Sequence, residues 1–255
     1  MKSYKAYAKV NIFLKITGMR GDYHEILSRF VLVNNLFDTL TFVTKEESAF
    51  KIEGSFSCKT EQNTIYKAYV ALLDATHSES LKRLMQSHAI RVEKQIPAFA
   101  GLGGGSSDAA TYLLMCNEVL HLGLSRTELA TIGAKVGADV PFFVYGYQSA
   151  NVSGIGEIVE AFDEEPLSIK TITPNIEIST PKVYQEFRKS FYKELSSQEA
   201  DKLSTMYSLD VLQSMTPTKA NDLFEPAVQL YPKLQEQQPV GWFFSGSGSS
   251  FFTLN

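Results

Sequence analysis

Residues 97–107 read Pro97-Ala98-Phe99-Ala100-Gly101-Leu102-Gly103-Gly104-Gly105-Ser106-Ser107, with four glycines among the five positions 101–105. Glycine loses more backbone entropy on folding than other residues, so the cluster needs a structural reason. A merely flexible loop would not explain its place between a strand-like segment and a strongly patterned helix. Phosphate binding explains both, because free amides and a positive dipole gather at a helix N-terminus. We therefore predict a phosphate-binding loop in which Ser106 and Ser107 add hydroxyl donors and one of them caps the helix.

Two common nucleotide-binding motifs do not fit this loop. A Walker A loop requires a lysine after its last glycine, and no lysine follows Gly105. The dinucleotide-binding fingerprint requires glycine or alanine five residues after its first glycine, where this chain has Ser106. It also requires an acidic residue at the end of a second strand about 20 residues further on, and none is found there. The loop therefore represents a third kind of phosphate binding.

The composition is that of an ordinary globular protein. Its 255 residues are 44% hydrophobic and 20% charged, which is enough apolar material for one large core or two smaller ones. The formal net charge of −4 argues against binding to nucleic acid or to an anionic membrane, because both require a basic surface. A nucleotide site needs only a few local donors, so it remains possible.

Cysteine content and the N-terminal sequence indicate where the protein works. Two cysteines, Cys58 and Cys116, provide neither a disulfide framework nor a tetrahedral metal set. Lys2, Lys5 and Lys9 interrupt the apolar run that a signal peptide would need. No stretch approaches the ~18 apolar residues of a membrane span. We therefore expect a cytoplasmic protein with no membrane partner.

Hydrophobic periodicity predicts mixed helices and strands. Strand-like patterns cover residues 8–16, 26–33, 39–44, 88–95, 142–147 and 169–173. Helical patterns cover residues 64–75, 106–121, 125–136, 181–189 and 198–215. The helix at 125–136 opens with a capping box formed by Ser125 and Glu128. Pro141 is expected to end the helical region before the strand at 142–147.

The predicted fold class is α+β, arranged as two lobes with a cleft between them. The acidic stretch Asp163-Glu164-Glu165-Pro166 is the expected boundary between a domain of residues 1–160 and a domain of residues 161–255. The second domain closes with two short aromatic strands around a glycine-serine turn, Ser245–Gly248.

The stretch Pro97–Ala110 resembles the second motif of the GHMP kinase superfamily, Pro-x-x-x-Gly-Leu-Gly-Ser/Gly-Ser-Ser, at nearly every position. Shorter matches are spread over the chain: Ala8–Asn11, Tyr23–Glu25, Gly137–Pro141, Thr180–Pro181, Asn221–Leu223 and Ser245–Gly248. The resemblance implies a two-lobed GHMP kinase fold with an N-terminal ATP-binding lobe and a smaller C-terminal lobe. It also implies that Pro97–Ser107 binds ATP, accompanied by Mg²⁺. The chain is most similar to the branch that phosphorylates the 2-hydroxyl of a cytidine-diphosphate-linked methylerythritol, in the non-mevalonate route to isoprenoids.

Two residues are predicted to carry the chemistry, because phosphorylating an alcohol requires a proton acceptor and compensation of charge. Asp139 lies in a predicted turn between a helix and a strand, where an Asx-turn residue explains it equally well. The resemblance implies that it is the general base. Lys9 lies on a mostly apolar strand, where a lysine usually points to solvent. The resemblance implies instead that it keeps Asp139 ionised and stabilises the alkoxide, while Asn11 on the same face hydrogen-bonds the substrate.

Four residues are predicted, through the resemblance, to recognise the cytosine of such a substrate. Tyr23 and Tyr184 are expected to stack on the ring and His24 to hydrogen-bond its polar edge, while Thr180 lies close to Tyr184 in sequence. Each has an ordinary alternative, since a tyrosine is more often core and a histidine more often a surface or satisfied polar residue. The branch usually has glycine where this chain has Asp22, so the stacking partner stays open.

The resemblance also assigns residues to the adenine and to the phosphates. Asn63 and Lys94 match positions near adenine, although an asparagine before a helix is more often its N-cap. The turn Ser245–Ser249 would lie beside the substrate phosphates, with a plain hairpin as its alternative. No motif identifies the ligands of Mg²⁺.

Two other functions compete with this one. Another GHMP kinase, acting on mevalonate, homoserine or a sugar, would have no base to stack, so Tyr23, His24 and Tyr184 favour the cytidine substrate. A non-catalytic nucleotide-binding module would need neither Lys9 nor Asp139. We therefore expect a small-molecule kinase that transfers phosphate directly, without a phosphoenzyme. The oligomeric state does not follow from the sequence.

Overall fold

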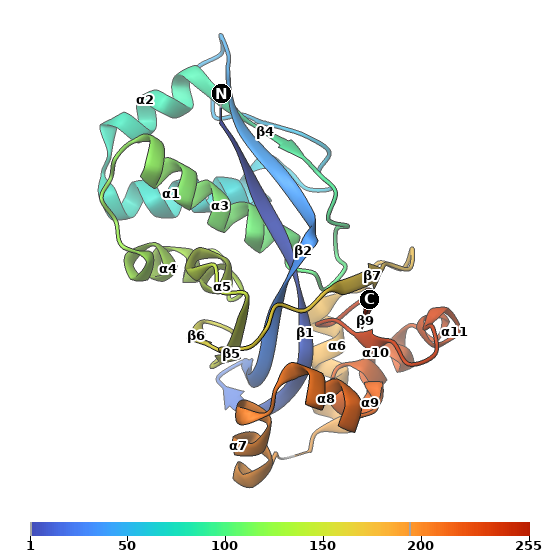
Figure 1. Ribbon diagram of the computed structural model, residues 1–255. Coiled ribbons are helices and arrows are strands. Elements are labelled where there is room, and N and C mark those ends of the chain that lie inside the picture. Colours follow the sequence, from blue (N-terminus) through green and yellow to red (C-terminus); the bar gives the residue numbers. More distant parts are fainter. Residues whose placement is uncertain (1, 194) are drawn as a thin grey trace. The chain divides into compact units, whose positions relative to one another are not determined.

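The computed structural model describes residues 2–193 and 195–255 (Figure 1). The chain forms two compact units, and both are discontinuous in sequence. The first unit contains the residues up to Ala8, Asn35–Ile96 and Gly104–Gly146, and the second contains Lys9–Asn34, Pro97–Gly103 and Tyr147–Asn255. The division of the sequence at residue 160 stays a prediction, since the second unit takes segments from both sides of that point.

The boundary between the units falls within two long strands and within the glycine-rich loop. The strands are β1 (Ser3–Arg20) and β2 (Tyr23–Thr44), which follow each other along the chain and pair with each other. They contain the predicted strands at 8–16, 26–33 and 39–44, so these predictions are confirmed. Because of the boundary, Lys9 belongs to the second unit and Asp139 to the first.

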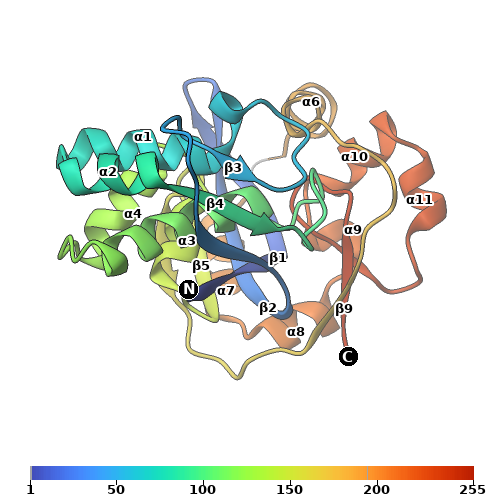
Figure 2. The same cartoon turned by 90° about the horizontal axis from the view of Figure 1, so that it is seen from above.

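The first unit packs helices on a small group of strands. Its strands include the Ser3–Ala8 part of β1, the Thr39–Thr44 part of β2, β3 (Ile52–Glu53) and β4 (His88–Glu93), with β4 antiparallel to β2 and parallel to β3. Its helices are α1 (Thr64–Thr76), α2 (Glu79–Ser87), α3 (Gly104–Val119), α4 (Arg126–Ala134) and α5 (Val140–Tyr145), with a 3-10 turn at Thr60–Gln62. Figures 1 and 2 show α1, α3 and α4 together on one side of the strands. The capping box of α4 is present as predicted.

Helix α5 replaces a predicted strand, so the prediction for residues 142–147 is wrong. The run Val140–Val144 is buried throughout, and an apolar run without periodicity does not distinguish a buried strand from a buried helix. Pro141 lies in the first turn, where its missing N–H costs no hydrogen bond, so it starts this helix instead of ending the helical region. Gly146, at φ 73°, ends the helix in the left-handed conformation that glycine adopts freely.

The second unit contains two groups of strands. The Ser28–Val31 part of β2 pairs with β5 (Ser149–Ser153), which pairs with β6 (Ile158–Ala161), and both pairs are antiparallel. A three-stranded sheet has the order β7 (Ile169–Ile172), β9 (Phe251–Leu254), β8 (Phe243–Phe244). The predicted strand at 169–173 and the aromatic strands near the chain's end are thus confirmed.

The helices of the second unit are short. They are α6 (Thr180–Glu186), a π-helical turn at Phe187–Phe191, α7 (Ser197–Thr205), α8 (Ser208–Ser214), α9 (Pro217–Ala220), α10 (Phe224–Leu230) and α11 (Lys233–Gln237). The helix predicted at 198–215 is interrupted, because Met206 and Tyr207 both have extended backbones. No helix within residues 2–193 or 195–255 is long and apolar enough to cross a membrane.

Candidate active site

The first half of the glycine-rich loop, Pro97–Gly103, packs against the turn Ser245–Gly248 within the second unit. We call this turn the C-terminal turn. Gly101 has φ +72°, and a Cβ added to it would lie 2.1 Å from the carbonyl oxygen of Ser245. The Ser245 hydroxyl donates to the carbonyl oxygen of Gly101 at 3.0 Å. Glycine is therefore required at 101 both for its backbone conformation and for this close approach.

The second half of the loop, Gly104–Ser107, is the first turn of α3 in the first unit. The helix begins at Gly104, earlier than predicted, so neither Ser106 nor Ser107 is its N-cap and that prediction is wrong. The permissive backbone of the glycines lets them enter the helix. The Thr64 hydroxyl donates to the carbonyl oxygen of Gly105 at 2.6 Å and fixes this turn to α1. The first four amides of any α-helix have no partner inside the helix, which makes this turn suited to an anion.

Lys94 lies between two buried carboxylates beside this turn. Its Nζ forms an ion pair with Asp38 and donates to Oδ2 of Asp108 at 2.8 Å. Asp38 is fully buried, and its Oδ1 also accepts hydrogen bonds from two backbone amides, those of Gln95 at 2.6 Å and Ile96 at 2.8 Å. We call Asp38, Lys94 and Asp108 the ionic cluster.

Two members of the ionic cluster, Lys94 and Asp108, have raised pKa values. Burial raises the pKa of the Asp108 carboxyl to about 7, an effect that the Lys94 ammonium opposes and the Asp38 carboxylate reinforces. Burial alone would lower the pKa of Lys94, but the two carboxylates outweigh it and the pKa is raised. The buried Oδ1 of Asp108 accepts no hydrogen bond from the described residues. Two carboxylates thus share one ammonium, which leaves the cluster prone to take up a proton.

The cluster also contacts the glycine-rich loop. A Cβ added to Gly104 would lie 2.9 Å from Cγ2 of Ile96 and 3.6 Å from Nζ of Lys94. Asp108 follows the loop directly, in the second turn of α3. The sequence predicts that Lys94 lies near adenine, and this role stays a prediction. The structure adds that its ammonium is held against the start of α3.

Lys9 and Asn11 lie on β1 in the second unit. Lys9 is only 3% exposed, so the solvent-facing alternative for this lysine is wrong. Its Nζ donates to Oδ1 of Asn11 at 2.7 Å and lies 4.4 Å from the ring centroid of Phe30. Nδ2 of Asn11 donates to the hydroxyl of Ser28 at 2.9 Å. The two predicted site residues are therefore adjacent and preorganised.

Asp139 lies in the first unit between α4 and α5, in a turn before a helix and not before a strand as predicted. Its side chain makes no capping hydrogen bond to α5, so capping does not explain the carboxylate. A Cβ added to Gly137 would lie 3.7 Å from Oγ of Ser106. The turn with the predicted general base therefore lies beside the first turn of α3. Its relation to Lys9 stays a prediction, because that lysine belongs to the other unit.

The second unit brings His24 and Tyr184 together. Their ring centroids are 5.0 Å apart with an interplanar angle of 36°, and the ring of Phe187 lies 6.1 Å from that of His24. Burial, with a smaller contribution from Arg188, lowers the pKa of His24. The buried Nε2 of His24 has no hydrogen-bond partner among the described residues. Tyr23, the other predicted stacking residue, lies at the surface with 66% of its area exposed.

Thr180 and the C-terminal turn are also adjacent. The hydroxyls of Thr180 and Ser247 are 2.6 Å apart. A Cβ added to Gly246 would lie 3.1 Å from the carbonyl oxygen of Gly101 and 3.5 Å from Oδ1 of Asn11. The second unit thus gathers three predicted binding elements, Thr180, Asn11 and the Gly101 part of the loop, around the turn Ser245–Gly248.

Asn63 is the N-cap of α1, which is the alternative role expected for an asparagine before a helix. Its side chain accepts a hydrogen bond from the backbone amide of Ile65 at 2.9 Å and caps α1. A role in binding adenine stays a prediction. No group of three or more His, Cys, Asp or Glu side chains able to hold a metal occurs within the part of the chain that the structure describes.

Sequence reasoning missed two residues of the ionic cluster. Asp108 follows the loop motif immediately, and a carboxylate directly before the mostly apolar run 109–116 was the available signal. Asp38 gave a weaker signal, because it is a single acidic residue in a strand whose partner Lys94 lies far away in sequence.

Comparison with known proteins gives consistent results along the whole chain. Residues 63–147 match the family model of the GHMP kinases N terminal domain. A protein of Sulfurimonas denitrificans named 4-diphosphocytidyl-2-C-methyl-D-erythritol kinase is 62% identical over 100% of this chain and 97% of its own length. A protein of the same name from a Campylobacter jejuni strain is 41% identical over 98% of this chain and 99% of its own.

Solved structures agree with these relatives. The crystal structure of a 4-(cytidine 5'-diphospho)-2C-methyl-D-erythritol kinase is similar with a TM-score of 0.76 and 30% identity, covering 99% of this chain and 90% of that one. The mevalonate kinase of Methanococcus jannaschii is similar with a TM-score of 0.60 at 13% identity, over 99% of this chain and 90% of that one, which is a likeness of fold.

Proposed function

Because the chain belongs to the 4-diphosphocytidyl-2-C-methyl-D-erythritol kinases of the GHMP kinase family, we propose that it transfers the γ-phosphate of ATP to the 2-hydroxyl of 4-diphosphocytidyl-2-C-methyl-D-erythritol. The observation that carries the proposal is the placement of the Asp139 turn beside Ser106, at the start of the predicted phosphate-binding helix. A proton acceptor close to bound phosphate is what transfer to an alcohol requires.

In the proposed reaction Asp139 accepts the proton of the substrate's 2-hydroxyl while the hydroxyl oxygen forms a bond to the γ-phosphorus of ATP. The bond from that phosphorus to the β–γ bridging oxygen breaks, and ADP leaves. Lys9, buried and hydrogen-bonded to Asn11, supplies the positive charge that compensates the developing alkoxide. The amides of Gly104–Ser107 at the start of α3 hold the phosphates of ATP.

Magnesium would enter with the nucleotide. Mg²⁺ usually keeps several waters and binds substrate phosphates with only one or two carboxylates. When bound, it would neutralise phosphate charge during transfer.

Recognition of the cytosine is proposed for the His24–Tyr184 pair. The tilted contact of the two rings offers an aromatic surface, and the buried Nε2 of His24 offers a polar group for the edge of a base. Since the pKa of His24 is lowered, the ring is neutral at pH 7, and one nitrogen donates while the other accepts.

A coupled assay of ADP release tests the proposal with the cytidine substrate, mevalonate and homoserine as acceptors. We expect turnover only with the cytidine substrate. Asp139→Asn, which keeps the size but removes the proton acceptor, should lower kcat by about 10²-fold or more and leave ATP binding, followed by calorimetry, close to that of the native enzyme. Turnover with mevalonate alone would overturn the substrate, and near-normal kcat of Asp139→Asn would overturn the base.

A further inference from the structure

Asn221 is a buried residue with no part in the chemistry proposed above. It lies between α9 and α10 and is 1% exposed. Its Nδ2 donates to the carbonyl oxygens of Phe244 and Gly246, both at 2.9 Å. Its Oδ1 accepts from the backbone amide of Leu223 at 2.9 Å. Both donors of the side-chain amide are therefore used to hold one turn.

The turn held by Asn221 is the one around which the predicted binding residues gather. A trans peptide unit is planar, with its carbonyl oxygen and its N–H on opposite sides. Since the carbonyl oxygen of Gly246 points to Asn221, the N–H of Ser247 points away from it. A turn amide presented in this way suits an anionic group such as a phosphate.

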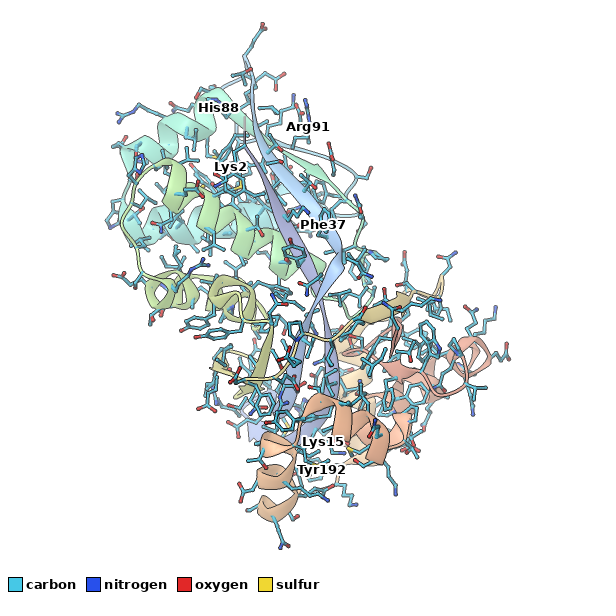
Figure 3. All side chains as sticks on the ribbon, in the orientation of Figure 1. Lys2, Lys15, Phe37, His88, Arg91 and Tyr192 are labelled. Carbon is cyan, nitrogen blue, oxygen red and sulfur yellow. The ribbon has the colours of Figure 1, made fainter. Side chains whose placement is uncertain are left out.

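The backbone around Asn221 is fastened to β1, the strand that carries Lys9. Leu14 and Asn221 form an isolated parallel bridge, and the amide of Asp222 donates to the carbonyl oxygen of Leu14 at 2.9 Å. Asp222 also forms an ion pair with Lys15, which is labelled in Figure 3. Asn221 thus joins the turn to the strand of the predicted catalytic lysine.

We propose that Asn221 is a positioning residue that orients the Ser245–Gly248 turn so that the backbone amide of Ser247 binds the diphosphate of the acceptor substrate. The inference rests on the proposed function, because a cytidine-diphosphate acceptor supplies the anionic group for the turn. The side chain acts through the turn and does not touch the substrate.

Asn221→Asp tests this role, because it keeps the shape and places an oxygen against the two carbonyl oxygens that the amide held. We expect kcat/KM for the cytidine substrate to fall about 10- to 100-fold, as a small misplacement of binding groups can cause. The KM for this substrate should change more than the KM for ATP. Asp222→Asn is the matched control, since it removes the ion pair to Lys15 but keeps an oxygen that accepts from the backbone amide of Ile16 on β1 at 2.9 Å.

The two variants separate positioning from stability. Asp222→Asn should lower the melting temperature and leave the kinetic constants close to those of the native enzyme. If Asn221→Asp lowers the melting temperature but keeps native kinetic constants, the positioning role is overturned. If Asn221→Asp does not fold, Asn221→Ser retains one hydroxyl donor and should show an intermediate loss of kcat/KM. Native kcat/KM in a folded Asn221→Ser enzyme would then overturn the proposal.

Failure of the proposed function gives a different result. If the native enzyme phosphorylates none of the three acceptors, the proposed function is contradicted. The positioning of the turn by Asn221 is not tested by that result. Backbone hydrogen exchange then decides, because Asn221→Ser should speed exchange at the 245–248 amides relative to Asp222→Asn. Equal exchange in these two variants would overturn the inference.

Discussion

The first half of the glycine-rich loop, Pro97–Gly103, is held by neutral groups, whereas the second half, Gly104–Ser107, starts a helix held beside buried charges. In the first half, carbonyl oxygens accept from neutral donors, such as the hydroxyl of Ser245 and the backbone amide of Lys9. In the second half, the Lys94 ammonium lies beside Gly104 and is shared by two carboxylates. The predicted phosphate-binding loop thus combines two kinds of polar support.

The difference matters because neutral and ionic supports respond differently to perturbation. A neutral hydrogen bond contributes about 0.5–1.5 kcal/mol and does not titrate. A buried ion cluster bears a desolvation penalty, and loss of one member leaves the others uncompensated. Variants of the ionic cluster should therefore destabilise the protein more than variants of the first half, and of these two supports only the ionic cluster should make stability depend on pH.

The largest effect is expected for Asp38→Ala. The substitution removes the fully buried carboxylate that pairs with Lys94 and accepts the amides of Gln95 and Ile96. Breaking a buried pair in this way costs about 3–5 kcal/mol, measured from urea unfolding followed by circular dichroism. Asp38→Asn is the control, since it keeps an oxygen for the two amides, and it should lose less. A loss below about 1 kcal/mol for Asp38→Ala would show that the cluster does not support the loop.

The second effect is a pH dependence that comes from Asp108. Its folded pKa of about 7 lies above its ordinary value of 3.8, so between these values the folded state binds more protons than the unfolded state. The free energy of unfolding should therefore fall as pH rises through that window, by at most about 1.4 kcal/mol per pH unit. The lowered pKa of His24 acts in the opposite direction just below pH 6.5.

Asp108→Asn isolates this contribution, because it leaves His24 unchanged. Urea unfolding between pH 5 and 8 should show a shallower decline for Asp108→Asn than for the native protein. Parallel pH profiles of the two proteins would contradict the assignment of the slope to Asp108.

Elements with a local signal in the sequence could be predicted, and elements without one could not. The loop, α3, α4 and parts of the long strands β1 and β2 follow from local signals such as glycine clustering, a capping box and periodic apolar residues. Helix α5 was missed because the run Val140–Val144 is apolar at every position and has no period to detect. The break between α7 and α8 at Met206 was missed because extended residues there carry no glycine or proline.

The residues of the candidate site also divide into those that a local signal predicts and those that only the folded chain brings together. Lys9 and Asn11 are two residues apart on one strand, so the alternation of side chains along a strand is enough to predict that they share a face. Asp38 and Lys94 are brought together by strand pairing between β2 and β4, which a single sequence does not reveal. Asn221 was recognised only as part of a matching segment, since its role depends on carbonyl oxygens more than 20 residues away.

The smallest effect is expected for Ser245→Ala, which removes one neutral hydrogen bond to the carbonyl oxygen of Gly101. The loss should be about 0.5–1.5 kcal/mol and the same at pH 6 and pH 8, because neither partner titrates. Ser250→Ala is the matched control, since Ser250 is equally buried and its hydroxyl lies 2.7 Å from that of Thr173. Both variants should lose similar stability in urea, but only Ser245→Ala loosens the loop and weakens ATP binding measured by calorimetry. Equal ATP affinity in the two variants, or a loss of stability that changes with pH, would show that the neutral support of the first half is not what orders the loop for phosphate.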